Sequence, residues 1–380
     1  MRPLAIVIAL LLSCTAAPVA VPSPSASATS SSTPLVRPAA TASPTQPATR
    51  ALIGSLTASL GFIRPEDPHG FTFPILSDGH YAAASLGDGH GLYRVIAVDL
   101  SSGVTRTVAV PEGSFGGIAG LDNGRLAISL WRPIPGSDLR GYDYEVEDLA
   151  TTTRQTLDRF EIPGRFHSQG SPAAPYATVV LGRSAVAYNH LYVQGDRVYA
   201  ELRVGPVGGP MRVAVTTSEV VTPVALNDTA LLYTISAGEQ DVIHLYDLTT
   251  GRDRVLLRAP TGTGLALNND RLLYSTHMNT PTAQASRLVL RDLATDAEST
   301  LTTGNCTYPS LNERYAMAGC ADGGRSPTNL IAFDLATLQP VEVARSSEPL
   351  AGPRVAPGVI YWVRYAGAPP ITAYLELLRY

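Results

Sequence analysis

Histidine is the side chain best suited to acid–base and zinc chemistry, and the seven histidines of this chain lie far apart. They are His69, His80, His90, His167, His190, His244 and His277. Three of them, His90, His190 and His277, are predicted in the same class of loop of alternate repeating units, where three imidazoles and a water could hold Zn²⁺. Loops of alternate units lie too far apart for joint ligation, so we expect no metal ion and no cofactor. Motifs for a serine-hydrolase elbow, a zinc protease helix, a P-loop and an EF-hand are absent from the sequence.

A second chemical pattern is the acidic alternation of Asp143, Glu145 and Glu147. On a strand, residues at two-residue spacing share one side and lie roughly 6.5–7 Å apart. That spacing does not build the compact oxygen cage that Ca²⁺ requires. We therefore interpret these carboxylates as a solvated strand face.

The best candidate for a binding face is a set of aromatic and polar side chains in the loops between the second and third strands of each unit. The set comprises Trp131, Arg132, Asp138, Arg140, His190, Tyr192, Gln194, Glu239, Gln240, His277, Asn279, Asp322, Arg325, Arg364 and Tyr365. In a ring of units these loops share one face, and such side chains suit a protein, peptide or glycan partner. The alternative is that they are solvated loops without a partner.

These residues are placed by a repeat in which a strand-like run meets a tight polar turn and resumes as an apolar strand. The turns are Leu76-Ser77-Asp78-Gly79, Leu121-Asp122-Asn123-Gly124, Leu181-Gly182-Arg183-Ser184, Leu226-Asn227-Asp228-Thr229, Leu267-Asn268-Asn269-Asp270, Leu311-Asn312-Glu313-Arg314 and Val355-Ala356-Pro357-Gly358. A repeat of roughly 40–50 residues is typical of propellers and other arrays.

The second half of each unit is equally regular. A third strand often ends in Asp-Leu, and a turn and a fourth strand follow. The pairs are Asp99-Leu100, Asp148-Leu149, Asp247-Leu248, Asp292-Leu293 and Asp334-Leu335. Four short strands per unit predict a propeller blade rather than a sandwich. The last unit lacks a fourth strand, and residues 51–57 can supply it, so we predict an all-β fold: a seven-bladed β-propeller closed by an N-terminal strand.

The phrase strand, Asp-Leu-x-Thr/Ser-x-Gly, strand, repeated with drift over residues 51–380, resembles the repeats of TolB-like and WD40-like seven-bladed propellers. The Gly-His and Trp-Asp pairs of strict WD40 repeats are missing. The third unit departs most, with an extra stretch near residues 162–176 and no Asp-Leu. The resemblance implies a propeller frame, which by itself names no activity.

The N-terminus indicates export. Arg2, an apolar run over residues 4–12 and the small residue Ser13 form the parts of a secretory signal that is too short to span a bilayer. The tetrapeptide Leu11-Leu12-Ser13-Cys14 resembles the bacterial lipobox, which implies that Cys14 is lipidated. Residues 14–50, rich in Ala, Pro, Ser and Thr, are predicted to be a disordered tether. The predicted organisation is a signal peptide at 1–13, a lipidated tether at 14–50 and a propeller at 51–380.

Two further cysteines, Cys306 and Cys320, flank the sixth turn symmetrically. An antiparallel hairpin would place them opposite each other, and an exported protein favours oxidation of such a pair. We predict a structural disulfide. Free thiols are the alternative, and no Cys-x-x-Cys spacing supports a redox pair.

The bulk properties narrow the function. A net charge of −4 with no basic stripe argues against nucleic-acid binding. We expect a non-catalytic, lipid-anchored binding or scaffold module of the bacterial envelope, on the outer face of the membrane or in the periplasm. The rival hypothesis is an envelope hydrolase or lyase acting on glycan or peptide, with Asp138 or Asp322 and His190 or His277 as acid and base. A third hypothesis is a sensor or assembly factor.

Overall fold

The structure is a computed structural model that describes residues 55–62, 76–87, 92–166, 179–276, 287–321, 327–366 and 372–380. The predicted signal, Cys14 and the tether lie outside the described residues. So do His277, Asn279, Asp322 and Arg325 of the predicted binding face. In the described part, no helix is long and apolar enough to cross a membrane.

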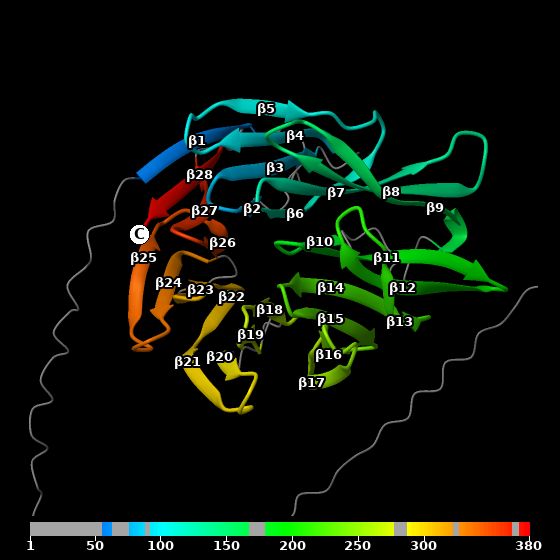
Figure 1. The fold of residues 1–380 in the computed structure, drawn as a ribbon. Helices are drawn as coiled ribbons and strands as arrows, with labels where there is room; N and C mark the ends of the chain where they lie inside the picture. Colours follow the sequence, from blue (N-terminus) through cyan, green and yellow to red (C-terminus); the bar gives the residue numbers. More distant parts are fainter. Residues whose placement is uncertain are drawn as a thin grey trace, which may run out of the picture. The chain divides into compact units, whose positions relative to one another are not determined.

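Seven four-stranded antiparallel sheets form the seven blades of a β-propeller, as predicted (Figure 1). Blade 1 comprises β2 (Leu76–Ser77), β3 (Tyr81–Gly87), β4 (Leu92–Asp99) and β5 (Thr105–Val108); blade 2 comprises β6 (Phe115–Asp122), β7 (Arg125–Pro133), β8 (Leu139–Asp148) and β9 (Arg154–Pro163). After η1 (Gly164–Phe166), blade 3 comprises β10 (Val179–Leu181), β11 (Ala185–Gln194), β12 (Arg197–Pro206) and β13 (Arg212–Thr217); blade 4 comprises β14 (Val220–Leu226), β15 (Ala230–Ala237), β16 (Gln240–Asp247) and β17 (Asp253–Pro260). Blade 5 comprises β18 (Gly264–Leu267), β19 (Arg271–Ser275), β20 (Arg287–Asp292) and β21 (Glu298–Thr303); blade 6 comprises β22 (Asn305–Leu311), β23 (Tyr315–Ala321), β24 (Asn329–Asp334) and β25 (Pro340–Arg345). Blade 7 comprises β26 (Leu350–Ala356), β27 (Val359–Ala366), β28 (Thr372–Arg379) and the N-terminal β1 (Ser55–Phe62).

The N-terminal strand closes the ring, as predicted. Of residues 51–57, which are expected to pair, residues 51–54 lie outside the described residues; β1 runs from Ser55 to Phe62 and pairs antiparallel with β28. The register runs from Ser55↔Leu378 to Phe62↔Thr372. Closure removes the open edge that β28 would otherwise present.

The seven predicted turns join the first and second strands, and hydrogen bonds between them link neighbouring blades. We call this set the turn belt. Its bonds are Gly124 N–H to Asp78 Oδ2 (2.6 Å), Arg125 Nη2 to Gly182 O (3.2 Å), Ser184 Oγ to Asp228 Oδ1 (3.4 Å), Asn227 Nδ2 to Asn268 O (3.0 Å), Asn268 Nδ2 to Asn312 O (3.0 Å), Asn312 Nδ2 to Ala356 O (3.3 Å) and Ser77 N–H to Tyr361 Oη (2.8 Å). Every blade junction therefore has a polar contact at this face.

One position of the turn belt explains why the repeat drifts. Asn227, Asn268 and Asn312 each cap their own turn with Oδ1 and reach the next blade with Nδ2. In blade 3 the equivalent residue is Gly182, where a Cβ would lie 2.9 Å from the Leu226 carbonyl oxygen. A side chain does not fit there, and the contact from blade 3 to blade 4 is made by Ser184 Oγ and Asp228 Oδ1 instead.

The Asp-Leu pairs build the turns between the third and fourth strands on the same face. Asp148, for example, accepts hydrogen bonds from the amides of Ala150 and Thr151. These bonds hold the pKa of Asp148 below its usual range, and the bond from Thr151 has the largest effect. The following amide, Leu149 N–H, donates to Gly124 O at 2.8 Å. Each Asp-Leu thus ties the outer turn of a blade to its inner turn.

The hydrophobic core lies between the blades. The largest cluster spans blades 2, 3 and 4 and includes the fully buried Tyr144, Leu202 and Tyr233. In blades 1 to 5 the fifth residue of the second strand is a buried polar residue: Ser85, Ser129, Asn189, Thr234 and Ser275. Ser275 Oγ of blade 5 donates to the Cys306 carbonyl of blade 6 at 2.5 Å.

The predicted disulfide is present. Cys306 and Cys320 are directly paired across β22 and β23 and are bonded to each other. Both are buried, so the bond is part of the blade 6 core.

Candidate functional site

The predicted binding-face residues lie mostly in strands rather than loops, which corrects the sequence prediction. Trp131 and Arg132 are in β7, Arg140 in β8, His190, Tyr192 and Gln194 in β11, Gln240 in β16, and Arg364 and Tyr365 in β27. Only Asp138 and Glu239 lie in connecting turns among those described. The second and third strands of blades 2 and 3 extend through these polar positions and are nine or ten residues long.

A row of aromatic rings crosses from blade 2 to blade 3, and we call it the aromatic row. Its members are Tyr142, Phe160, His190, Tyr192 and Tyr199. Successive ring centroids lie 5.0, 5.2, 6.5 and 5.7 Å apart. The rings align because alternate residues of β11 share one side and Tyr192 pairs directly with Tyr199 of β12.

The aromatic row is buried at one end and open at the other. Tyr142 and Phe160 are buried, and burial raises the pKa of Tyr142 above its usual range. His190, Tyr192 and Tyr199 are half-buried. The open end therefore offers stacked ring surface to solvent next to the exposed β11–β12 turn.

Hydrogen-bonding groups flank the half-buried rings. His190 Nδ1 lies 2.7 Å from Asp158 Oδ2 of β9, so the pair joins blades 2 and 3. An ionised carboxylate only accepts, so Nδ1 donates in this pair. Arg203 lies 3.7 Å from the same carboxylate oxygen and donates to Glu201 at 2.7 Å. The half-buried rings of the aromatic row thus lie beside charged and hydrogen-bonding side chains.

At the blade 2 end, Arg140 and Trp131 extend the same side. Arg140 lies close enough to Tyr142 to lower its pKa slightly against the dominant effect of burial. Arg140 Nε is buried without a hydrogen-bond partner among the described residues. Trp131 stacks on Phe115, with ring centroids 4.4 Å apart.

The acidic alternation on β8 is a buried ladder of ion pairs, not the solvated face that was predicted. Asp143 and Glu147 are each 4% exposed. Asp143 accepts from Arg132 Nη1 at 2.6 Å and also from Arg159, and these two bonds occupy both of its oxygens. Arg154 and Arg106 hold Glu147, at 2.5 and 2.8 Å. Arg106 belongs to blade 1, so the ladder is covered by a neighbouring blade that the strand pattern alone does not reveal.

The other predicted residues are not brought to the aromatic row. Asp138 is exposed, and its carbonyl accepts from the Gly164 amide. Arg364 is held by Glu376 at 2.7 Å and Glu348 at 3.0 Å within blade 7. Glu239 accepts from the Thr261 amide through its carbonyl, Gln240 pairs with Pro260, and Tyr365 pairs with Ala373.

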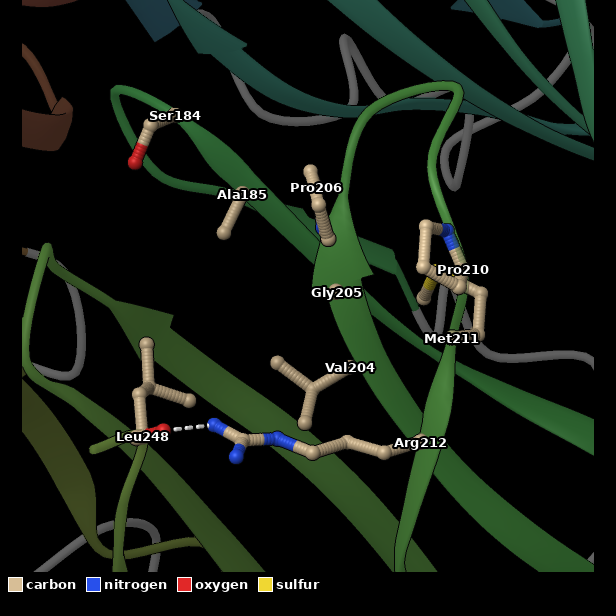
Figure 2. A pocket seen from close by; sticks show the side chains of 9 residues that line it. All are labelled: Ser184, Ala185, Val204, Gly205, Pro206, Pro210, Met211, Arg212 and Leu248. Atoms are coloured by element: carbon tan, nitrogen blue, oxygen red, sulfur yellow. Dashed lines mark hydrogen bonds between the residues drawn. The ribbon is translucent and has the colours of Figure 1, made fainter. Parts of the chain in front are cut away.

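A cavity of about 520 Å³ lies between blades 3 and 4, away from the predicted face. Figure 2 shows Val204, Pro206 and Met211 on one side and Leu248 on the other. Arg212 crosses it, and its guanidinium donates to the Leu248 carbonyl. Arg254 makes the same kind of bond to Leu293 one blade further on, so the arginine is part of the blade contact. The remaining lining is mostly apolar and offers little directed chemistry.

The described residues contain no group of three or more His, Cys, Asp or Glu side chains able to hold a metal ion. His190 is paired with Asp158 alone and His244 with Asp253 alone. Neither pair has the third ligand of a zinc site.

No family model matches this sequence, and no curated protein matches it. Solved structures share its fold. An oligogalacturonate lyase in complex with manganese matches with a TM-score of 0.53 and 13% identity, over 85% of this chain and 98% of its own. The β-propeller domain of the Trilobed protease from Pyrococcus furiosus matches with a TM-score of 0.56 and 9% identity, over 81% and 93%. A prolyl endopeptidase matches at 0.56 and 15%, over 84% of this chain and 47% of its own. Identities this low show the fold alone.

Sequence reasoning found His190 and Tyr192 but missed Phe160, Tyr199 and Asp158. The alternation of Tyr188, His190 and Tyr192 is a strand signal that could have joined them on one side. Asp158 lies in another blade, and only the packing of β9 against β11 brings it to His190.

Proposed function

We propose that this protein is a non-catalytic, extracytoplasmic binding propeller whose ligand is a glycan chain held on the aromatic row. The observation that carries the proposal is the stacking of His190, Tyr192 and Tyr199 as a half-buried surface flanked by hydrogen-bonding side chains. Tyrosine offers an apolar ring face and a polar hydroxyl, which suits a partner that is apolar on one side and wet at its edge.

A glycan fits this surface better than a peptide does. A sugar ring has an apolar C–H face and a rim of hydroxyls, and here ring faces lie beside the hydrogen-bonding groups of His190 and of the charged pair Arg203 and Glu201. Extended peptides usually add to an open sheet edge or insert side chains into pockets. The aromatic row lies on the face of β11 and β12, which are paired with each other and with β10 and β13. One structural neighbour is named as a lyase of oligogalacturonate, so a propeller of this kind can act on a glycan.

The test is calorimetric binding of three defined hexasaccharides, of glucose, N-acetylglucosamine and galacturonic acid, to the folded protein. We expect at least one to bind, and we expect Tyr192→Ala to weaken that binding at least tenfold, about 1.4 kcal/mol. Tyr315→Ala is the matched control, because Tyr315 is a half-buried tyrosine at the turn belt. Equal losses in both variants, or no binding by the wild type, would contradict the proposal.

A lyase or hydrolase is the second candidate, favoured by the His190–Asp158 pair beside the row. Of its predicted acid–base residues, Asp138 is exposed in the β7–β8 turn, and His277 and Asp322 lie outside the described residues. Mass spectrometry of each hexasaccharide after long incubation separates the two functions. We expect the chain length to stay at six sugars, and shorter products that disappear in His190→Ala would establish the enzyme.

The extracytoplasmic part of the proposal is supported by the Cys306–Cys320 disulfide, since such bonds persist in oxidising compartments. We further propose that Cys14 carries the lipid and that residues 14–50 tether the propeller to the membrane. Mass spectrometry of the mature N-terminus should show an acylated Cys14. An unmodified N-terminus beyond Cys14 would rule out the anchor.

A further inference from the structure

Tyr308 has a backbone conformation that its residue type disfavours. Its φ is +55°, in the left-handed region, where non-glycine residues are uncommon and bulky ones are outliers. It also precedes Pro309, whose ring restricts the residue before it toward extended conformations. Such strain persists only when the surrounding structure holds it, and it is concentrated at functional sites.

The neighbouring blade contains the same feature without the strain. In blade 6 the register with β23 shifts between Thr307 and Ser310, and in blade 7 the register with β27 shifts between Ala351 and Arg354. The residues inside the two bulges are Tyr308-Pro309 and Gly352-Pro353. Gly352 has a φ of +54°, so the fold uses glycine at the position where blade 6 has tyrosine.

The Tyr308 side chain is not required for packing. It is 40% exposed, whereas Cys306 on the same strand is 2% and Ser310 is 5% exposed. A Cβ built on the equivalent Gly352 meets nothing within 4 Å. β22 is the first strand of its blade and lies between β18 and β26, the first strands of the blades on either side (Figure 1). First strands border the central channel of a propeller, so an exposed residue of β22 lies beside that channel.

The backbone around Tyr308 is held on both sides of the bulge. On one side, Cys306 is bonded to Cys320, and its carbonyl accepts from Ser275 Oγ of blade 5. On the other side, Ser310 Oγ accepts from the Val355 amide of blade 7 at 2.9 Å. The backbone that carries the ring is therefore fixed before any ligand arrives, which lowers the ordering cost of a contact.

We infer that Tyr308 is a ligand-contact residue of the central channel, where its ring stacks on a sugar of the bound glycan. The ligand class rests on the proposed function. The inference itself rests on the equivalence of Tyr308 and Gly352. The fold accepts glycine at this position, so a strained and exposed tyrosine there lowers the stability without any gain in packing.

The experiment compares Tyr308→Gly and Tyr308→Phe in thermal unfolding and in binding of the three hexasaccharides. We expect Tyr308→Gly to leave Tm unchanged or to raise it by up to about 4 °C, and to weaken binding at least tenfold. Tyr308→Phe keeps the ring and should bind within about threefold of the wild type. Leu338→Gly is the control, because Leu338 has a φ of +56° and is also 40% exposed, but lies in an outer turn. It should gain stability in the same way and bind normally.

The outcomes separate the inference from the proposed function. A lower Tm in Tyr308→Gly would show that the ring packs, and unchanged affinity beside a binding wild type would show that it touches no ligand. Either result overturns the inference and leaves the aromatic row standing. If the wild type binds none of the three hexasaccharides, the proposed function and the inference fall together.

Discussion

The side chain of Asn268 donates a hydrogen bond from Nδ2 to the backbone carbonyl of Asn312, 3.0 Å away in the next blade. Its Oδ1 accepts from the amides of Asp270 and Arg271 in its own turn. One buried amide therefore caps a turn and joins two blades, which is the role that the repeated turn residue has in the turn belt.

Replacing Asn268 by alanine removes all of these bonds and leaves buried backbone groups unsatisfied. We expect Asn268→Ala to lower the free energy of unfolding by about 1–3 kcal/mol. Urea unfolding followed by tryptophan fluorescence measures it. Asn269→Ala is the control, since Asn269 is exposed and reaches only the Glu313 side chain. If both variants unfold at the same urea concentration, the turn belt does not stabilise the ring.

The junction of blades 7 and 1 gives a prediction in alkaline solution. The Tyr361 hydroxyl is buried and accepts from the Ser77 amide at 2.8 Å, and burial raises the pKa of Tyr361 to about 12. The unfolded chain loses this proton near pH 10. Stability from Tyr361 is therefore fully present below about pH 10 and is lost as the pH rises toward 12.

Tyr361→Phe separates the two effects. At pH 7 the variant should lose about 1–3 kcal/mol, because the Ser77 amide loses its acceptor. Between pH 10 and 12 its stability should fall by about 2 kcal/mol less than that of the wild type. Urea midpoints at pH 8, 10 and 11.5 measure both effects, and parallel pH profiles would contradict the second.

Asp122, at the end of β6, should be unfavourable to folding at neutral pH. Its Oδ2 is buried without a hydrogen-bond partner among the described residues, and desolvation raises the pKa of its carboxyl. A raised pKa in the folded state adds stability below the unfolded pKa near 4, and that stability is lost as the pH rises.

Asp122→Asn removes the charge. We expect it to stabilise the protein at pH 7 by about 0.5 kcal/mol, a modest value because the group is partly exposed and screened. At pH 3 the variant and the wild type should unfold alike. The measurement is Tm at both pH values, and a loss of stability at pH 7 would show that the carboxylate makes a favourable contact.

Removing the disulfide should cost substantial stability because Cys306 and Cys320 close a loop with a sequence separation of 14 residues. We expect the double variant Cys306→Ala/Cys320→Ala to lose about 3 kcal/mol, chiefly through the greater freedom of its unfolded chain. Both sulfur atoms are replaced so that no free thiol remains. Wild type unfolded in reductant should match the double variant, and unchanged stability in both would exclude a structural role.

Much of the fold could be read from local patterns. The turn residues at Asp78, Asn227 and Asn268 cap their own turns through bonds spanning three residues, so they mark each hairpin in the sequence itself. The Asp-Leu pairs mark the outer turns for the same reason. The cysteine pairing followed from the symmetry of one hairpin. The closing strand was found, but its register was set by β28, which lies more than 300 residues away.

Less of the candidate site could be read in this way. The predicted face includes His190 and Tyr192, but Asp158 and Phe160 reach His190 from another blade. The carboxylates of Asp143 and Glu147 were predicted to be solvated because residue alternation does not reveal the arginines that pair with them. Arg132 and Arg159 of the same blade hold Asp143, and Arg106 of blade 1 reaches Glu147.

The sequence by itself determined the number of blades, the order of strands and the disulfide, because turns and strand alternation depend on residues a few positions apart. The tertiary structure decided which side chains meet between blades and which polar residues are buried. It also decided that Tyr308 has the same position in blade 6 that Gly352 has in blade 7. Contacts between blades depend on strand register. A single bulge shifts that register, and the alternation of residues in the sequence does not reveal where the bulge lies.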